Sequence, residues 1–221
     1  MLHFLYAKIS SKLFMKALVI YRTVLYDNGV VNEQKLTHKN KSKRKRKSSF
    51  TDTGKVVHMT VATSLFAPDA VYTSDKTSKE EVLEEVYGKL LKAGYVKGNF
   101  LSHIIEREEH YPTGIDTSPI SKELPNVAIP HTEGEFVNAR LVVPIALKHP
   151  IKFQNMIAPD ESLEVKFLFM ILNNDPEGQA NVLAQIMGFL STTPVEDLIR
   201  LFNLTSTKEI FDFMSENFKQ E

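Results

Sequence analysis

The stretch Asn126-Val127-Ala128-Ile129-Pro130-His131 decides how the fold of this chain is interpreted. Three apolar residues in a row, closed by a proline, are typical of a short buried strand. Pro130 has a fixed φ and no backbone N–H, so it ends the strand and holds the next residue in place. The pattern predicts that His131 stands at the surface edge of a sheet, where α/β proteins place their functional sites.

Strands and helices alternate on both sides of this stretch. Residues 140–147 and 163–172 have the length and the apolar content of buried strands, and Pro144 predicts an edge position or a bulge for the first. Apolar spacing and capping residues predict helices over residues 78–92, 99–110, 177–190 and 194–202, and a last one from residue 206. We therefore expect an α/β fold, a mixed β-sheet flanked by helices in a single compact domain.

The formal net charge of the 221-residue chain is zero, with 27 basic and 27 acidic residues, but it averages two unlike parts. Residues 1–58 hold 13 basic and 3 acidic side chains, whereas residues 59–221 hold 14 and 24. The run Lys-Ser-Lys-Arg-Lys-Arg-Lys at residues 41–47 is typical of a disordered, solvated segment. We expect residues 1–58 to be a disordered basic leader and residues 59–221 to be the folded domain. A patch for nucleic acid or an anionic membrane is the alternative, but the run lacks interleaved aromatic residues.

Several classes of chemistry are excluded by what the sequence lacks. Without cysteine there is no disulfide, no thiolate nucleophile and no sulfur-ligated zinc, which fits a reducing compartment. Neither a dinucleotide-binding glycine motif, a P-loop nor a nucleophile elbow is present. The apolar stretch at residues 13–31 contains Lys16, Arg22 and Asp27, so it is not expected to span a membrane.

Of the seven histidines, His131 has the most informative context. His103 lies at the boundary of a predicted helix, His110 closes that helix, and His149 precedes a proline in a predicted loop, so structural roles are expected for these three. An imidazole near neutrality can act as a nucleophile at one nitrogen while the other donates to a backbone carbonyl. That chemistry suits a phosphoryl carrier, although the spacing alone leaves a purely structural histidine open.

The residues around His131 resemble a known family. Residues 127–131, Val-Ala-Ile-Pro-His, resemble the active-site motif of the IIA domains of the bacterial phosphoenolpyruvate-dependent sugar phosphotransferase system, fructose and mannitol type. Residues 106–108 followed by Pro-Thr-Gly at 112–114 are similar to the family's R-E…T-G segment. The helix that ends at Gly94-Tyr95-Val96 is also similar to that of the family. The resemblance covers about residues 62–218.

The resemblance implies a phosphoryl relay. His131 would accept a phosphoryl group from the phosphohistidine of the carrier HPr and pass it to a cysteine of a IIB domain. Arg107 matches the family arginine and would place its planar cation on the phosphoryl oxygens. Such a transfer needs no metal or other cofactor. Ile129 and Phe136, apolar and near His131, are expected to form an exposed docking patch.

One position departs from the family pattern. Mannitol-type members have a second histidine at the start of the helix after the long strand, where this sequence has Gln179. Glutamine can donate a hydrogen bond but cannot be protonated, so Gln179 is expected to bind rather than to titrate. The difference favours the galactitol-like branch of the family.

The resemblance also names partners. The chain has neither the cysteine of a IIB domain nor the membrane spans of a IIC domain, so we expect a cytoplasmic phosphotransferase that acts with a separate IIB chain and, indirectly, with a membrane IIC. Nucleic acid is not expected as a partner. The alternative is a regulatory module whose phosphorylation at His131 signals to a transcription factor or another protein. Such regulators usually carry fused DNA-binding domains, so transport is favoured.

Overall fold

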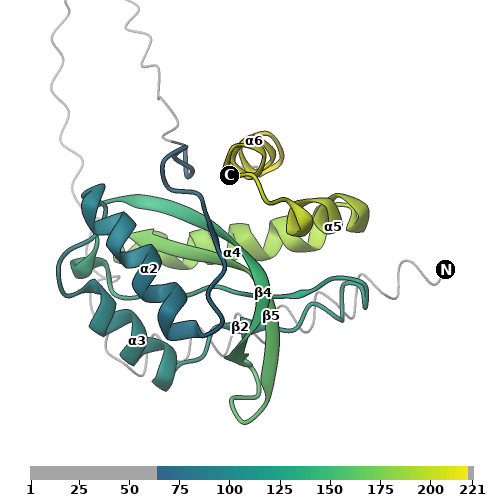
Figure 1. Cartoon of the computed structure of the whole chain (residues 1–221), viewed down its shortest axis with the longest axis horizontal. Coiled ribbons are helices and arrows are strands. Elements are labelled where there is room, and N and C mark those ends of the chain that lie inside the picture. The colour runs from purple at the N-terminus through teal and green to yellow at the C-terminus, as the bar shows by residue number, and fades with distance from the viewer. Residues whose placement is uncertain (1–63, 219–221) are drawn as a thin grey trace, which may run out of the picture.

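The computed structural model describes residues 64–218, without the side chains of residues 176–180. The predicted leader, residues 1–58, lies outside this part. The described strands form one five-stranded sheet in the order β1-β4-β5-β3-β2 (Figure 1). Their bounds are β1 Tyr72–Ser74, β2 Gly114–Ile115, β3 Asn126–Ala128, β4 Arg140–Gln154 and β5 Ser162–Asn173. Because β1 and β4 pair in parallel, as do β3 and β5, while β4–β5 and β2–β3 are antiparallel, the sheet is mixed, as predicted.

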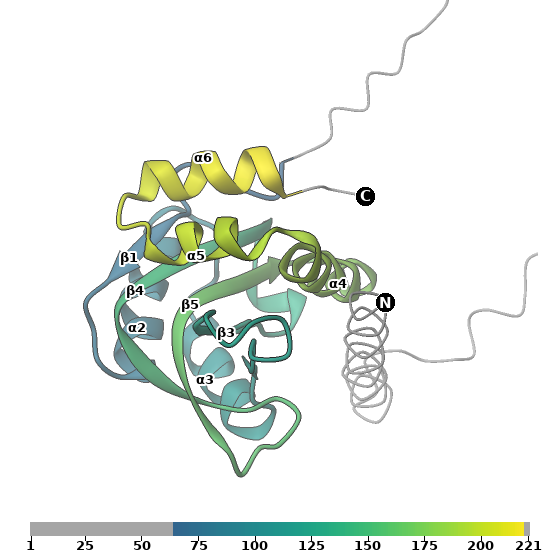
Figure 2. The same ribbon diagram turned by 90° about the vertical axis from the view of Figure 1, so that its right-hand side faces the viewer.

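Helices cover both faces of the sheet. The described α-helices are α2 Lys79–Lys92, α3 Phe100–His110, α4 Pro176–Thr192, α5 Val195–Asn203 and α6 Thr207–Asn217, and η2 Gly134–Phe136 is a short 3-10 turn. Figures 1 and 2 show α2 and α3 on one face and α4, α5 and α6 on the other. The predicted α/β class is confirmed. None of the helices in residues 64–218 has the length and apolar character needed to cross a bilayer.

The core is divided by the sheet into two clusters. Along β5, side chains alternate between the faces, as the pleat of a strand requires. Phe167, Phe169 and Ile171 pack under α4, α5 and α6. Leu168 and Met170 pack instead against α2 and α3. A strand buried on both faces has no polar side, which is why residues 167–172 of β5 appear in the sequence as an unbroken apolar run.

The predicted helix caps are confirmed at Ser78 and Ser206, but the one predicted at Asn99 is wrong. Ser78 accepts a hydrogen bond from the backbone N–H of Glu81 and begins α2, and Ser206 accepts one from Glu209 and begins α6. Asn99 precedes α3 but makes no side-chain capping bond. Gly94, with φ of 79°, follows α2 in the left-handed conformation that glycine adopts without strain.

Two predictions about β4 are wrong. Pro144 was expected to mark an edge or a bulge, but β4 lies between β1 and β5, and its register shift falls between Ala146 and Ile151. The N–H of Val142 donates to Leu65, on the side away from β5, at 2.7 Å. Since N–H directions alternate along a strand, the nitrogen of Pro144 faces the same way, and its missing proton removes no bond to β5. His149, expected in a loop, lies within β4 at the shifted, exposed part of the strand.

Candidate active site

His131 is held at the end of β3 by the neighbouring strand β5. The backbone N–H of Ile171 donates to the carbonyl oxygen of Pro130 at 3.0 Å, and His131 forms an isolated parallel bridge with Ile171. The predicted place after a strand is therefore confirmed. The predicted surface position is wrong, because His131 is only 3% exposed. The reason is that β5 continues to Asn173, beyond the bridge, so the sheet extends past the histidine.

Backbone contacts determine which imidazole nitrogen of His131 carries the proton. Its Nδ1 lies 2.8 Å from the carbonyl oxygen of Ile129. A carbonyl oxygen can only accept, so Nδ1 must donate, and in the neutral ring the lone pair is on Nε2. Burial, followed by the positive charge of Arg107, lowers the pKa of His131 to about 4 against the opposing effects of the Ile129 hydrogen bond and Glu133. At neutral pH the ring is thus uncharged, with a lone pair on Nε2 that is able to act as a nucleophile.

Arg107 provides the positive charge beside His131. It lies in the last turn of α3, half-buried, and its Nη1 donates to the carbonyl oxygen of Tyr111 at 3.3 Å. Its guanidinium lies over the Tyr111 ring, with Cζ 4.3 Å from the ring centroid. These contacts orient a planar cation whose charge acts on His131 and Glu133. The structure thus brings together the two residues that the sequence singled out.

A carboxylate follows the histidine in the chain. The hydroxyl of the buried Thr132 donates to Oε2 of Glu133 at 2.7 Å. Burial raises the pKa of Glu133, but hydrogen bonds from Thr132 and from its own backbone, with the charges of Arg107 and His103, lower it overall. Arg107 therefore acts on a carboxylate as well as on the imidazole.

The predicted docking patch at Ile129 and Phe136 is wrong, because both side chains are buried. Ile129 is 0% exposed and belongs to the core cluster beneath α4, α5 and α6. Phe136, in η2, is 8% exposed and stacks on the His103 ring of α3, with centroids 3.7 Å apart and planes at 10°. Both residues support the site from within the fold and offer no surface to a partner.

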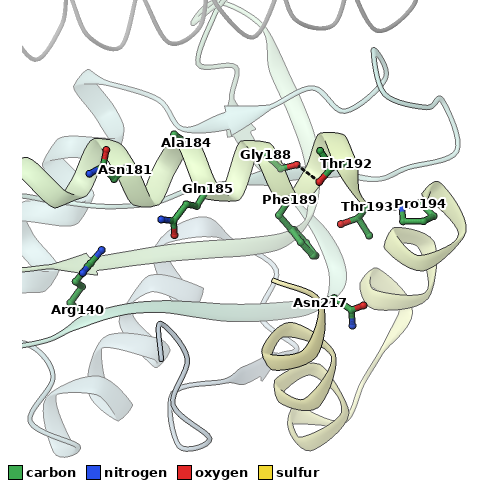
Figure 3. A pocket seen from close by; sticks show the side chains of 10 residues that line it. All are labelled: Arg140, Asn181, Ala184, Gln185, Gly188, Phe189, Thr192, Thr193, Pro194 and Asn217. Atoms are coloured by element: carbon green, nitrogen blue, oxygen red, sulfur yellow. Dashed lines mark hydrogen bonds between the residues drawn. The ribbon is translucent and has the colours of Figure 1, made fainter. Parts of the chain in front are cut away.

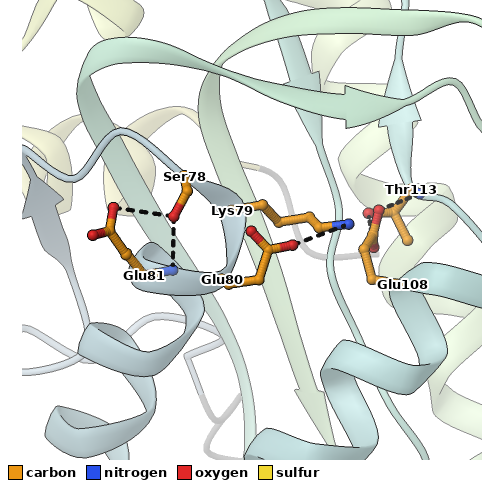
Figure 4. A network of polar contacts seen from close by, with 6 residues as sticks. All are labelled: Ser78, Lys79, Glu80, Glu81, Glu108 and Thr113. Carbon is orange, nitrogen blue, oxygen red and sulfur yellow. Dashed lines mark hydrogen bonds and ion pairs between the residues drawn. The ribbon is translucent and has the colours of Figure 1, made fainter.

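Two residues of the site had no role assigned from the sequence. Glu108 of α3 is buried, and its Oε1 and Oε2 accept from the backbone N–H and the hydroxyl of Thr113 at 2.9 Å and 2.7 Å (Figure 4). Burial raises the pKa of Glu108 to about 7, while the Thr113 hydrogen bonds and the charges of Lys79 and Arg107 lower it. Its position was a detectable signal: Glu108 follows Phe100 and Ile104 at intervals of four residues, on the apolar stripe of the helix.

The segment after Thr113 requires a glycine for space. A Cβ at Gly114 would lie 2.5 Å from the carbonyl oxygen of Gln154. Gly114 pairs with Ala128 in β3 and its carbonyl oxygen accepts from the N–H of Met156 at 2.8 Å. The Thr-Gly sequence thus combines a side-chain anchor with a close backbone approach, directly beside the strand that leads to His131.

Comparison with known proteins decides the family. The family model "Phosphoenolpyruvate-dependent sugar phosphotransferase system, EIIA 2" matches residues 64–217. The chain belongs to this family. As a type 2 EIIA protein it is a phosphoryl carrier of that system, and the resemblance found in the sequence is confirmed.

Proteins similar to this EIIA protein in sequence or in fold agree with the family assignment. It is 24% identical over 149 residues to the galactitol-specific EIIA component of Escherichia coli strain K12, covering 67% of this chain and 93% of the relative. Its fold is similar to that of mannitol IIA from Escherichia coli, with a TM-score of 0.52 and 20% identity. The match covers 67% of this chain and 98% of mannitol IIA. A solved complex of mannitol IIA with phosphorylated IIB from the same species matches with a TM-score of 0.53 and 19% identity. This match covers 68% of this chain and 97% of the matched chain. The nitrogen regulatory protein IIA-Ntr from Neisseria meningitidis matches with a TM-score of 0.52 and 20% identity, and the match covers 68% of this chain and 96% of that protein.

Gln179, the position that departs from the mannitol-type pattern, lies in the first turn of α4. Its side chain is outside the part of the chain that the structure describes. Its expected binding role in the EIIA site therefore stays a prediction.

A separate cavity of about 820 Å³ runs along α4 of the EIIA domain (Figure 3). Arg140 and Asn217 contribute to its walls, and so does Gln185, whose buried Oε1 has no hydrogen-bond partner within residues 64–218. Among the predicted site residues whose side chains the structure describes, none lines this cavity. The residues around His131 therefore form a site distinct from it.

Proposed function

We propose that Nε2 of His131 accepts a phosphoryl group from the phosphohistidine of HPr and passes it to a cysteine of a separate IIB chain during uptake of a sugar or polyol. The observation that supports this most strongly is the hydrogen bond from Nδ1 of His131 to Ile129, because it places the lone pair on Nε2. The low pKa of the buried ring supports it as well, since only the neutral form has that lone pair at pH 7.

In the first step, the lone pair of Nε2 attacks the phosphorus of phospho-HPr in line with the bond that breaks. The N–P bond of HPr gives its electron pair back to the HPr imidazole, and a new Nε2–P bond forms. His131 keeps its Nδ1 proton and becomes a phosphorylated imidazolium. The Nδ1–H bond to the Ile129 carbonyl is then charge-assisted and strengthens as positive charge develops. Arg107 stabilises the phosphoryl oxygens in transit.

The second step reverses this chemistry toward a sulfur atom. A thiolate of the IIB partner attacks the phosphorus, an S–P bond forms, and the Nε2–P electron pair returns to the ring. His131 is restored to the neutral tautomer without any net proton transfer. The solved complex of a mannitol IIA with phosphorylated IIB supports this class of partner.

Transport rather than signalling is supported by the relatives at the sequence level, which are galactitol-specific EIIA components. Regulation by phosphorylation of the same histidine is the competing outcome. Adding candidate IIB proteins to the phosphorylated chain separates the two, because a transport component loses its phosphoryl group to a IIB cysteine. Retention of the phosphoryl group with every IIB supplied favours regulation.

The proposal is tested by incubating the full chain with phosphoenolpyruvate, Enzyme I and HPr. We expect one acid-labile, base-stable phosphoryl group per chain. His131→Ala should abolish it, and His149→Ala, at an exposed position in β4, should keep it. Undiminished labelling of His131→Ala contradicts the proposal.

A further inference from the structure

We propose that Glu108 is a positioning residue for His131, acting through Thr113 and Ile129; the inference rests on the proposed function of His131. Four hydrogen bonds connect the two side chains. Thr113 donates to Glu108 through its backbone N–H at 2.9 Å and its hydroxyl at 2.7 Å. The carbonyl oxygen of Thr113 accepts from the N–H of Ile129 at 3.2 Å, and the carbonyl oxygen of Ile129 accepts from Nδ1 of His131 at 2.8 Å.

The contact between Glu108 and Thr113 fixes a whole residue. Both carboxylate oxygens bind the same threonine, one at its backbone and one at its side chain. A two-point contact sets orientation as well as distance, because rotation about either bond would break the other. The peptide group of Thr113 is thereby fixed relative to α3, and its carbonyl oxygen is directed at Ile129.

Ile129 transmits this orientation to the imidazole. Its N–H is bound to Thr113 on the β2 side, and its carbonyl oxygen binds His131. The side chain itself is fully buried in the core. With the residue held at its side chain and its N–H, the direction of the carbonyl oxygen is set, and with it the tautomer and the ring angle of His131.

Helix α3 therefore positions both the cation and the imidazole ring of the site. Arg107 places the cation beside the imidazole, and the next residue, Glu108, anchors the hydrogen-bond chain that orients the ring. Because neighbouring residues point about a quarter-turn or more apart on a helix, one can face the site and the other the core. A shift of α3 would displace both together and preserve their geometry.

The charged groups that face Glu108 come from two helices. Arg107 precedes it in α3, and Lys79 extends toward it from the first turn of α2 (Figure 4). The Lys79 side chain is 15% exposed and lies 3.8 Å from Glu80. When Glu108 takes up a proton, its new hydroxyl must donate, and the Thr113 hydroxyl must change from donor to acceptor. Protonation of Glu108 should therefore alter the hydrogen bonds between Glu108 and Thr113 without removing the contact.

This coupling gives a spectroscopic readout that needs no phosphoryl donor. Burial holds the pKa of His131 near 4, so its ring stays neutral between pH 5.5 and about 8.5. We expect the imidazole ¹⁵N resonances of His131 to show Nδ1–H and, within this range, a small shift with a midpoint of about 7 that reports Glu108. Glu108→Gln should abolish the shift. His103→Gln, which removes a titratable ring near the site, should leave it.

Phosphorylation kinetics give the second readout. Glu108→Ala removes the anchor, so we expect the Nε2–H tautomer of His131 to become populated and phosphorylation by phospho-HPr to slow about ten- to a hundredfold. Glu108→Gln should restore most of the rate, because its amide oxygen accepts from the Thr113 N–H and its nitrogen donates to the hydroxyl. Glu109→Gln, exposed and adjacent in α3, is the matched control and should match the wild type.

The outcomes are separable. A folded Glu108→Ala variant with a wild-type tautomer and rate overturns the inference. If Glu108→Ala does not fold, Thr113→Val takes its place: it loses one arm of the contact, and an unchanged ¹⁵N spectrum then overturns the inference. Failure of phospho-HPr to label the wild type contradicts the proposed function alone, because the ¹⁵N spectra still decide whether Glu108 orients the ring.

Discussion

Nδ1 of His131 donates to the carbonyl oxygen of Ile129, two residues earlier in the chain, at 2.8 Å. This contact places the ring proton on Nδ1 and leaves the lone pair on Nε2. In the proposed transfer it would also stabilise the imidazolium that forms when Nε2 bonds to phosphorus. A histidine buried only for packing would need a partner for its N–H, but it would not need a cation beside it, and Arg107 supplies one.

His131 and Glu108, both buried and titratable, should have opposite effects on the pH dependence of stability. The pKa of His131 is lowered from 6.5 to about 4 in the fold, so its contribution to stability is present above pH 6.5 and is lost as the pH falls toward 4. The pKa of Glu108 is raised from 4.5 to about 7, so its contribution is present below pH 4.5 and is lost as the pH rises toward 7. Each amounts to about 3 kcal/mol at most.

Single variants should expose these opposed effects. Between pH 4.5 and 8, Glu108→Gln should gain stability relative to the wild type by up to about 3 kcal/mol, because glutamine does not ionise. His131→Gln should gain a similar amount relative to the wild type as the pH falls from 7 to 4. Urea denaturation at each pH measures both differences. If the difference in the free energy of unfolding between variant and wild type does not change with pH, these groups titrate with the same pKa in the folded and the unfolded chain.

Arg107 should be required for the rate of transfer. We expect Arg107→Ala to slow phosphorylation about a hundredfold, by analogy with the loss of one preorganised donor in other enzymes. Arg107→Lys should recover only part of the rate, since an ammonium cannot bind two phosphoryl oxygens in a planar fork. Loss of the positive charge should also raise the pKa of His131, measurable by ¹⁵N titration. Arg200→Ala, at an exposed position of α5, is the control and should change neither quantity.

Gly114 should be sensitive to the smallest substitution. Gly114→Ala would place its Cβ 2.5 Å from a backbone oxygen, so we expect a loss of about 1–3 kcal/mol in the free energy of unfolding. Gly88→Ala, in α2 with nothing within 4 Å of the added Cβ, should instead stabilise by about 0.5–1 kcal/mol. Thermal or urea denaturation of the pair distinguishes a steric requirement from general sensitivity to added methyl groups.

Residues 1–58 are predicted to be dispensable for phosphoryl acceptance. The family match begins at residue 64, and the charge composition changes near residue 59. Removal of residues 1–58 should leave the rate of labelling by phospho-HPr within about twofold, as expected for a change outside the residues that match the family. A chain that no longer accepts the phosphoryl group after this deletion would assign the segment a role in the domain.

Much of the fold could be predicted because its signals are local. The caps at Ser78 and Ser206 and the apolar run at residues 167–172 of β5 depend on neighbouring residues only. The central position of β4 could not be predicted from Pro144. A proline is tolerated in this strand because its nitrogen faces away from β5, and that direction is known only once the pairing of β4 with β1 and β5 is known.

The site was predictable in its chemistry but not in its surroundings. The motif placed His131 after a strand and linked it to Arg107, whereas the burial of Ile129, Phe136 and the histidine itself depends on how far β5 extends and on where η2 turns. The role of Glu108 requires a contact with Thr113 five residues away, which only the paths of α3 and β2 bring about. An acidic residue on the apolar stripe of a helix was the available clue.

Phosphoryl transfer to His131 is tested most decisively by locating the phosphoryl group on the ring. The ¹⁵N-histidine-labelled chain, phosphorylated with phosphoenolpyruvate, Enzyme I and HPr, is examined by ³¹P and ¹⁵N NMR. We expect phosphorus coupled to Nε2 of His131, with Nδ1 still protonated. Phosphorus on Nδ1 of His131, or on any other residue, would contradict it.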